Sequence, residues 1–472
     1  YVTHKREDGT YQPLKEHLEN VAALAEAFAK SFHSPLEGRR NGLLHDIGKY
    51  SDRGQARQRD PEHTARVDHA SAGAQEAGRL GDVHAAFAIA GHHGGLLDSG
   101  KGDGTMSARL QKRLDGGDDP AAWKTEIQAP KETDIPAWVQ KEPIAGAMYT
   151  RMLFSCLVDA DFLDTETALQ GPQPRGGYAD VETLLQRLKE HVAGWLENPC
   201  NELCRRRNEI LARCLCGGTD MQGLYTLTVP TGGGKTVASL AFALSHAKAH
   251  SMKRVIYVIP YTSIIEQTAD VFRKILGEEN VLEHHSQIKI PDDEEEETPE
   301  AYRKRLACEN WDAPVVVTTA VQFFESLYAA KTSKCRKLHN IANSVVLFDE
   351  AQSLPADLTS VTLQAVNELC GRYHTTMVFS TATQPDFSAR KDLTWKPREI
   401  LPESGEMFRA LQRVKVDWRL GEDTPLETIA EEMSGQDSVC AIVNLRRHAR
   451  QIAGRLSELC PKDTVFYLTT DL

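Results

Sequence analysis

Histidine and aspartate side chains in the first third of the chain have the types and order that suit divalent metal ions. The set consists of His17, His45, Asp46, His69, His92, His93 and Asp159. Imidazole and carboxylate ligands together suit borderline transition metals, and a carboxylate such as Asp46 can bridge two ions. Two neighbouring ions stabilise both the attacking and the leaving oxygen of a phosphodiester and lower the pKa of the attacking water. The sequence therefore predicts metal-dependent hydrolysis of a phosphate ester.

This prediction depends on the whole set, because a single histidine near an apolar face is usually a satisfied core or surface residue. His45 and Asp46 end an apolar helical stretch, and His92 and His93 close a helix directly before two glycines. Packing gives little reason for either doublet.

Two members of the set have a competitor elsewhere in the sequence. Asp161 competes with Asp159, because both lie in one Val-Asp-Ala-Asp segment, and we favour Asp159. His63 is a weaker competitor for His69.

A second set of chemical groups lies in a glycine-rich segment between a predicted strand and a predicted helix. The residues expected to bind a nucleotide there are Thr231, Gly232, Gly233, Gly234, Lys235 and Thr236. The backbone amides of such a loop can hold phosphate, Lys235 can reach the outer phosphates, and the Thr236 hydroxyl can coordinate magnesium. The general phosphate-loop pattern has glycine where Val229 stands, so the strict match fails there.

Two acidic residues follow a buried apolar run about a hundred residues later. Asp349 can hold magnesium through water, and Glu350 can activate the hydrolytic water, which are the two roles that nucleotide hydrolysis requires. The hydroxyls of Ser380, Thr381 and Thr383 end the next predicted strand. We expect them to link the state of the nucleotide to a neighbouring groove.

The elements that must position these residues change in kind along the chain. Before residue 220 the periodicity predicts helices and no strand of weight, so this part is expected to be all-α; the helices span residues 13–33, 36–49, 68–80, 83–93 and 143–168. After residue 220, short apolar runs alternate with helical segments, which predicts a parallel sheet buried on both faces. The predicted strands are 224–229, 255–259, 315–318, 345–348 and 377–380.

We therefore expect a multidomain chain with three parts. Residues 1–200 form an all-α domain, 201–400 an α/β domain, and 401–472 the beginning of a second α/β domain, with strands at 439–443 and 465–468. No arginine-finger motif follows Arg447 before the last residue, which predicts a fragment of a longer protein that binds ATP weakly and does not unwind processively.

Composition excludes some classes of function. The net charge of −12 argues against indiscriminate coating of nucleic acid, although it allows a local basic groove. No apolar run approaches the roughly 20 residues that span a membrane, so no membrane association is expected and the cytoplasm is the expected location. The ten cysteines have neither disulfide-framework nor zinc spacing, so reduced thiols are expected.

The order His, His-Asp, His, His-His, Asp resembles the HD phosphohydrolase superfamily, and the His-His pair resembles its nuclease branch. The resemblance implies that one ion is held by His17, His45, Asp46 and Asp159, and the other by Asp46, His69, His92 and His93. It also implies that Lys49 lies near the scissile phosphate. This ligand mixture implies iron, manganese, cobalt or nickel more readily than magnesium alone. The residues predicted to be catalytic are His45, Asp46 and Lys49, with Glu350 in the nucleotide site.

The glycine-rich loop, the two acids and the hydroxyl cluster resemble motifs I, II and III of superfamily 2 helicases, with Asp-Glu-Ala-Gln as motif II. The resemblance implies a RecA-like fold that uses ATP with magnesium. The segments that begin at Pro260 and Thr318 look like motifs Ia and Ib, which contact the sugar-phosphate backbone and read no sequence.

An HD nuclease ahead of such a helicase resembles the helicase-nuclease effectors of type I CRISPR-Cas systems, across the whole chain. That resemblance implies movement on DNA in the 3′ to 5′ direction, single-stranded DNA as substrate, and recruitment by an RNA-guided surveillance complex (Cascade) after an R-loop forms. It adds an anti-CRISPR inhibitor as a further partner. The general character of the sequence, rather than a diagnostic motif, favours subtype I-C.

Two other functions are compatible with the residues. One is an HD phosphohydrolase of nucleotides whose α/β half is a regulatory ATP-binding module. The other is an RNA helicase with an inert HD domain.

Overall fold

The computed structural model describes most of the chain and divides it into two compact units, residues 1–411 and 412–472. The described residues are 1–102, 104–111, 121–286, 298–354, 359–385, 390–391, 393–402, 404–412, 414–421, 423–461 and 463–468. Each unit is described by itself.

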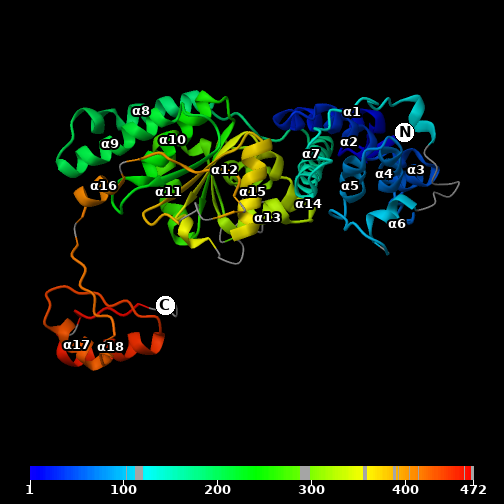
Figure 1. The fold of residues 1–472 in the computed structure, drawn as a ribbon. Coiled ribbons are helices and arrows are strands. Elements are labelled where there is room, and N and C mark those ends of the chain that lie inside the picture. Colours follow the sequence, from blue (N-terminus) through cyan, green and yellow to red (C-terminus); the bar gives the residue numbers. More distant parts are fainter. Residues whose placement is uncertain are drawn as a thin grey trace. The chain divides into compact units, whose positions relative to one another are not determined.

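The N-terminal part of the first unit is a bundle of helices, and its longest helix lies on the side next to the second part of the unit (Figure 1). The helices that confirm the predicted ones are α1 (Leu14–Ala29), α2 (Pro35–Leu44), α4 (Ala70–Arg79), α5 (Val83–Gly91) and α7 (Pro143–Gln170). Helix α7 packs against α1, α2 and α5. Two short helices were not predicted, α3 (Asp52–Arg59) and α6 (Met106–Gln111).

The expectation that this part is entirely helical is wrong at its start. Strands β1 (Val2–Lys5) and β2 (Tyr11–Pro13) form an antiparallel pair. Strands of 4 and 3 residues are too short to show a period-two pattern, which is why the sequence did not indicate them. The pair matters for function because β1 brings Thr3 and His4 to the metal-ligand cluster described below.

The second part of the unit contains a parallel sheet with the strand order β5-β6-β4-β7-β8-β3-β9. The five predicted strands are confirmed as β3 (Leu224–Thr228), β4 (Arg254–Ile259), β6 (Val315–Thr319), β7 (Ser344–Asp349) and β8 (Thr376–Thr381). The sequence missed the two short edge strands, β5 (Val281–His284) and β9 (Arg398–Glu399). Because the strands are parallel, the ends of β3, β7 and β8 meet at one edge of the sheet.

The two faces of the sheet are covered by different neighbours. One face packs on α8 (Val181–Glu197), α9 (Glu202–Gly217), α10 (Lys235–Ala249) and α11 (Thr262–Leu276). The other face shares a continuous buried core with the N-terminal helices, from Leu18 and Leu157 to Phe348. Helices α8 and α9 thus pack with the sheet, and the division predicted at residue 200 stays a prediction.

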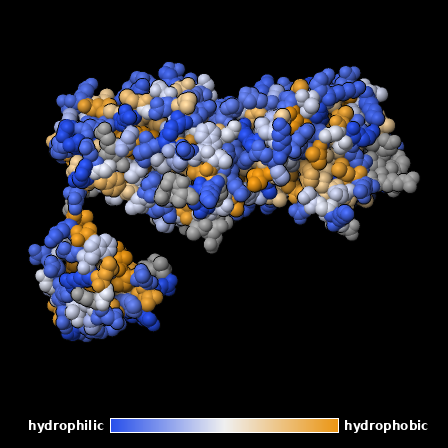
Figure 2. Space-filling view, viewed as in Figure 1, coloured by the Kyte–Doolittle hydropathy of each residue, from blue (hydrophilic) through white to orange (hydrophobic). Residues whose placement is uncertain are grey.

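The second unit is small and contains α17 (Leu426–Ser434) and α18 (Arg446–Leu459), which pack through a few apolar side chains. The prediction of strands at 439–443 and 465–468 is wrong, because the described residues there form no strand. A strand needs a neighbour for its backbone groups, and its own sequence does not supply one. Apolar side chains therefore lie on the surface of this unit (Figure 2), and Ile442 is 93% exposed.

Among the described residues, no helix is both long enough and apolar enough to cross a bilayer.

Candidate functional site

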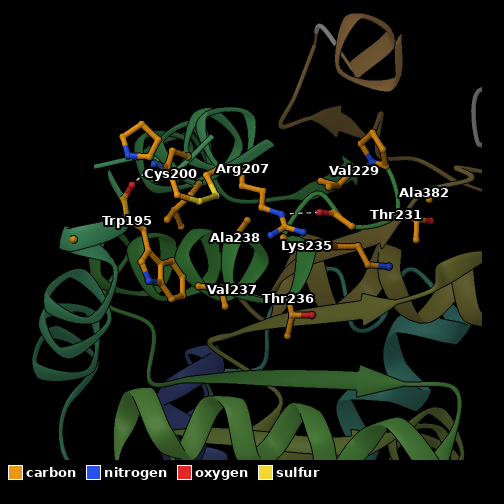
Figure 3. Close-up of a pocket in the computed structure, with 18 of the residues that line it drawn as sticks. Trp195, Cys200, Arg207, Val229, Thr231, Lys235, Thr236, Val237, Ala238 and Ala382 are labelled. Atoms are coloured by element: carbon orange, nitrogen blue, oxygen red, sulfur yellow. Dashed lines mark hydrogen bonds between the residues drawn. A yellow bond between two sulfur atoms is a disulfide. The ribbon is translucent and has the colours of Figure 1, made fainter. Parts of the chain in front are cut away.

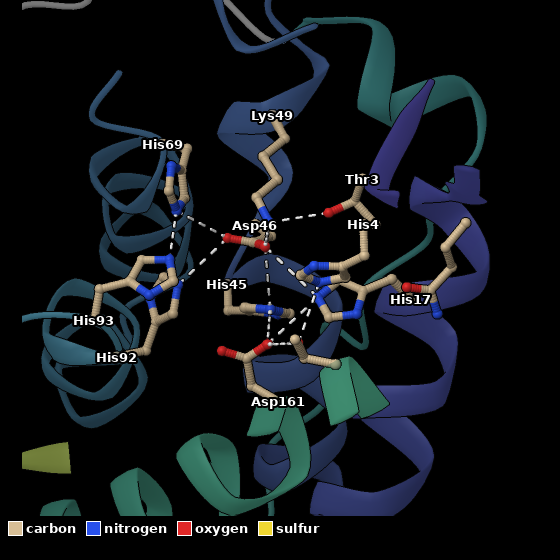
Figure 4. Close-up of polar contacts among 12 residues, drawn as sticks. Thr3, His4, His17, His45, Asp46, Lys49, His69, His92, His93 and Asp161 are labelled. Atoms are coloured by element: carbon tan, nitrogen blue, oxygen red, sulfur yellow. Dashed lines mark hydrogen bonds and ion pairs between the residues drawn. The ribbon is translucent and has the colours of Figure 1, made fainter. Parts of the chain in front are cut away.

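Six of the seven predicted metal ligands come together at the ends of helices in the N-terminal bundle (Figure 4). His17 lies on α1, His45 directly follows α2, His69 precedes α4, and His92 directly follows α5. Helix ends concentrate side chains at one level of a bundle, so residues far apart in sequence can meet there.

Asp46 lies at the centre of this cluster and divides it into two sets. Its Oδ2 atom is 3.6 Å from His17 Nε2 and 3.5 Å from His45 Nε2. Its Oδ1 atom is 3.3 Å from His69 Nε2 and 3.3 Å from His92 Nε2. Each oxygen of one carboxylate thus faces its own pair of imidazoles, which is the arrangement of a carboxylate that bridges two ions.

Each of three histidines is oriented by a bond from its other ring nitrogen. His17 Nδ1 lies 2.7 Å from Asp164 Oδ2, His45 Nδ1 lies 2.8 Å from the Gly42 carbonyl oxygen, and His92 Nδ1 lies 2.7 Å from the Ile89 carbonyl oxygen. These bonds turn the Nε2 atoms towards the cluster, as outer partners do for metal-binding histidines. The sequence analysis did not find Asp164, although it lies one helical turn beyond Asp161.

Several buried ligand atoms of the cluster have no hydrogen-bond partner among the described residues. Among the described residues, the Nε2 atoms of His17, His45 and His92 and the Oδ1 atom of Asp46 are buried without a hydrogen bond. Buried polar atoms normally have a partner, and a bound cation is one of the recognised reasons for an exception. The residues therefore fit a metal centre.

Asp159 is not part of this cluster, so the predicted metal role of Asp159 is wrong. The carboxylate of Asp161 is there instead, with Oδ1 3.5 Å from His17 Nε2 and 3.7 Å from His45 Nε2. Both aspartates lie on α7, and two positions along a helix rotate a side chain by about 200°. Only one of the two can face the cluster.

Asp159 points to the opposite side of α7 and joins the two halves of the unit. It is fully buried, accepts a bond of 2.8 Å from Arg336 Nε, and accepts another of 3.1 Å from Asn310 Nδ2. Burial raises the pKa of Asp159, and Arg336 opposes that shift.

The cluster holds its members in different states of charge. Burial would lower the pKa of His17, but its hydrogen bond to Asp164 and the nearby carboxylate of Asp46 outweigh burial and raise that pKa to about 9. Burial lowers the pKa of His69 to about 4 and that of His93 to about 3. Burial would raise the pKa of Asp46, but Lys49 and the neighbouring histidines outweigh it and lower the pKa. The neutral imidazoles of His69 and His93 and the ionised carboxylate of Asp46 are suited to bind a cation, whereas His17 must release its proton before it can act as a ligand.

Lys49 lies beside the bridging carboxylate. Its Nζ atom is 2.5 Å from Asp46 Oδ2 and donates a hydrogen bond of 3.1 Å to Thr3 Oγ1 (Figure 4). His63, the weaker competitor for His69, lies away from the cluster with a side chain 79% exposed and paired with Asp60.

The predicted nucleotide site lies at the edge of the sheet where β3, β7 and β8 end. The glycine-rich loop lines a cavity of about 780 Å³ (Figure 3). Gly232 and Gly234 have φ values of 82° and 80°, a region that favours glycine, and a Cβ at Gly233 would lie 2.6 Å from Val229 Cγ1. The tight turn therefore requires its glycines.

The charged groups of the nucleotide site contact one another. Lys235 Nζ lies 2.8 Å from Asp349 Oδ1 and also donates to Glu350. Burial would raise the pKa of Glu350, but Lys235 and Gln352 lower it. Gln352 donates 2.8 Å to Glu350 and accepts from Thr381, so it connects the acid to the end of β8.

Residues of α8 and α9 that were not predicted line the same cavity. Trp195 and Arg207 lie there, and Arg207 Nε donates 2.8 Å to the Gly232 carbonyl (Figure 3). No motif signals them. Cys200 and Cys204 also line the cavity and form a disulfide, with their Cα atoms 5.9 Å apart, which corrects the expectation of reduced thiols for this pair. The other eight cysteines are free, as expected.

Two family models match the chain in the order of its two halves. The model of the HD domain matches residues 14–122, and the model of the DEAD/DEAH box helicase matches residues 208–391.

Two known proteins are similar in sequence to this chain. The CRISPR-associated nuclease/helicase Cas3 of Haloferax volcanii is 27% identical over 447 residues, which cover 77% of this chain and 47% of that protein. A putative CRISPR-associated nuclease/helicase Cas3 of Methanocaldococcus jannaschii is 31% identical over 131 residues, which cover 26% of this chain and 18% of that protein. This chain thus spans about half the length of the Haloferax protein and a smaller share of the Methanocaldococcus protein.

The crystal structure of T. fusca Cas3-AMPPNP has a similar fold, with a TM-score of 0.54 at 18% identity over 89% of this chain and 53% of that one. The crystal structure of T. fusca Cas3-ATP gives a TM-score of 0.54 at 18% identity, over 90% and 53%. At this identity the likeness concerns the fold alone.

The chain therefore contains a helical HD domain followed by a RecA-like helicase domain with a parallel sheet, as predicted. This domain content and the similarity to Cas3 confirm the resemblance to the helicase-nuclease effectors of type I CRISPR-Cas systems. The subtype stays a prediction.

Proposed function

We propose that this chain is a metal-dependent single-stranded DNA nuclease joined to an ATP-driven helicase, and that it degrades DNA in the cytoplasm after CRISPR-guided recruitment. The observation that carries the nuclease is the geometry of Asp46. Its two oxygens each face a separate pair of imidazoles at 3.3–3.6 Å.

In the HD domain, His17, His45, Asp46 and Asp161 would hold one ion, and Asp46, His69, His92 and His93 the other. Bound iron, manganese, cobalt or nickel would supply Lewis acidity and a water of lowered pKa. The chain itself supplies orientation, because Asp164 and two main-chain carbonyls fix the imidazoles. Lys49 places a positive charge beside Asp46, where it can bind a phosphate oxygen.

In the helicase domain, the loop from Thr231 to Thr236 would hold the phosphates of ATP, with magnesium between Thr236 and Asp349. Glu350 would orient and activate the hydrolytic water. Its bond to Gln352, which in turn bonds Thr381, gives a route from the hydrolytic acid to the hydroxyls at the end of β8. We expect ATP hydrolysis to change contacts with the DNA strand by this route.

The finer parts of the proposal come from the likeness to Cas3 proteins. They are single-stranded DNA as substrate, movement in the 3′ to 5′ direction, recruitment by an RNA-guided surveillance complex at an R-loop, and inhibition by an anti-CRISPR protein. Specificity would then come from guide pairing rather than from the nuclease.

A cleavage assay on single-stranded DNA with manganese or cobalt and without ATP tests the proposal. We expect His45→Ala to abolish cleavage and Lys235→Ala to retain it. Metal analysis should find about two ions per chain, and fewer in Asp46→Ala. An HD domain without metal would instead support an RNA helicase with an inert HD domain.

The second candidate is a phosphohydrolase of free nucleotides with a regulatory ATP-binding module. A cavity of about 340 Å³ beside His69 and His93 favours it, because that volume is at the small end of the range for ligand pockets. Hydrolysis of nucleotides with single-stranded DNA left intact would support this candidate over the nuclease.

A further inference from the structure

A cavity of about 340 Å³ opens beside the metal-ligand cluster and extends away from it, between α3 and the segment that precedes α4. Its lining residues are Lys49, Gly54, Arg57, Gln58, Arg66, Val67, His69 and His93. None of the metal roles above explains the residues from α3 or from the 61–68 segment.

The cavity and the cluster share three side chains. His69 Nε2 lies 3.3 Å from Asp46 Oδ1, and His93 Nε2 lies 2.7 Å from His69 Nε2. Lys49 also belongs to both, because it lines the cavity and pairs with Asp46. A molecule in the cavity therefore lies next to any group that is held at the metal centre.

The charge of the cavity is opposite to that of the whole chain. The chain carries a net charge of −12, yet every charged side chain among the described lining residues is basic. The carboxylate of Asp46 balances Lys49, which leaves Arg57 and Arg66 as the sources of positive charge.

The two arginines differ in their contacts. The Nη1 atom of Arg57 donates to the carbonyl oxygens of Pro61 and Thr64, which fixes the segment leading to His69 but does not neutralise the guanidinium. Arg66 is exposed at the cavity and carries no comparable structural bond among the described contacts. Arg57 therefore combines charge with a structural role, whereas Arg66 contributes mainly charge.

We propose that this cavity is a phosphate subsite that binds the nucleic-acid strand one phosphate away from the bond that is cut. Guanidinium groups match phosphate oxygens with two parallel N–H donors, and phosphate contacts of this kind fix the register of a strand without reading sequence. The inference rests on the proposed nuclease and deepens it: Lys49 contacts the scissile phosphate, and Arg57 and Arg66 hold its neighbour.

The test compares Arg66→Ala with Arg59→Ala in the full chain, with manganese and without ATP. Arg59 is an exposed arginine on α3 outside the cavity lining, so the control removes the same charge nearby. We expect Arg66→Ala to raise KM for a short single-stranded oligonucleotide by roughly tenfold with little change in kcat. The slope of log(kcat/KM) against log salt should fall by about 0.7, the value for one phosphate contact on a single strand.

Two small probes separate the subsite from the metal centre. Hydrolysis of bis(p-nitrophenyl) phosphate, which has only the scissile phosphate, should be equal in both variants and the wild type. Inhibition by thymidine 3′,5′-bisphosphate, which offers a second phosphate, should weaken by roughly tenfold in Arg66→Ala alone.

The outcomes distinguish failure of the phosphate subsite from failure of the proposed nuclease. If the wild type cleaves DNA and the two variants behave alike, the phosphate subsite is wrong and the nuclease stands. If the wild type hydrolyses the small diester but never DNA, the proposed nuclease fails. If Arg66→Ala loses the small diester as well, Arg66 supports the metal centre rather than a second phosphate, which overturns the subsite.

Discussion

The metal centre and the nucleotide site are built in opposite ways. The metal centre gathers side chains from the ends of separate helices, and the Nε2 atoms of His17, His45 and His92 have no hydrogen-bond partner among the described residues. The nucleotide site is built mainly from one loop and the ends of adjacent parallel strands, and its charges are paired, Lys235 with Asp349 and Glu350. The packed helices of the metal centre fix its ligand atoms before a metal ion binds. At the sheet edge, the paired charges can exchange partners when a nucleotide binds.

The largest expected effect comes from removing the shared ligand of the metal centre. Asp46→Asn keeps the shape of the side chain but removes the charge that faces four imidazoles. We expect the metal content to fall and DNA cleavage to drop by about 1,000-fold, since each ion supplies several kcal/mol to such a reaction. ATP hydrolysis should be unchanged. A parallel loss of ATP hydrolysis would show that the two sites are not independent.

The reciprocal change is Lys235→Ala in the nucleotide site. Lys235 is the cation that can contact the outer phosphates, so we expect ATP hydrolysis to fall by about 100-fold. Cleavage of single-stranded DNA without ATP should stay within about twofold of the wild type, because none of the described contacts joins a metal ligand to this loop. Assays of both activities on one preparation check the comparison, and a metal content below that of the wild type would contradict it.

A matched pair on α7 tests which aspartate belongs to the metal centre. Asp161→Asn should reduce metal binding and cleavage by about 10- to 100-fold. Asp159→Asn should keep the metal but leave Arg336 buried with a weaker partner, which costs about 3 kcal/mol of stability. Metal analysis and thermal unfolding of the two variants measure the two effects. Equal metal loss in both would contradict the geometry.

The two sites also differ in how much of them the sequence predicts. The nucleotide loop is contiguous, and its glycines are required by local backbone geometry, so its residues could be identified directly. The metal histidines could be identified by their order, but not the choice between Asp159 and Asp161. That choice depends on which face of α7 meets α1, and a helix with buried residues all round does not reveal it.

The remaining differences have the same physical origin. Trp195 and Arg207 reach the nucleotide cavity because α8 and α9 pack on α10, a contact that no local pattern encodes. The hairpin that brings Thr3 to Lys49 is too short for its period to be visible. The segments at 439–443 and 465–468 have the composition of strands, but composition does not supply the neighbouring strand that a sheet requires.

The smallest expected effect tests whether the two halves of the first unit are fixed to each other. Gly95 follows the His92-His93 pair, has a φ of 98°, and a Cβ there would lie 2.7 Å from the Ala330 carbonyl oxygen. That oxygen also accepts a hydrogen bond of 3.0 Å from Leu96 N. It therefore joins the segment after the His92-His93 pair to the segment after α13 (Ala320–Tyr328) in the helicase domain.

Gly95→Ala should therefore strain the backbone and push the two domains apart locally, at a cost of about 1–2 kcal/mol. Gly94→Ala is the matched control, because a Cβ at Gly94 meets nothing within 4 Å. Calorimetry should show a transition midpoint roughly 2 °C lower for Gly95→Ala than for Gly94→Ala. Because Gly95 lies two residues from His93, DNA cleavage should fall as well, while ATP hydrolysis without DNA is retained. Identical midpoints and cleavage rates in the two variants would mean that the HD and helicase domains move independently at this contact.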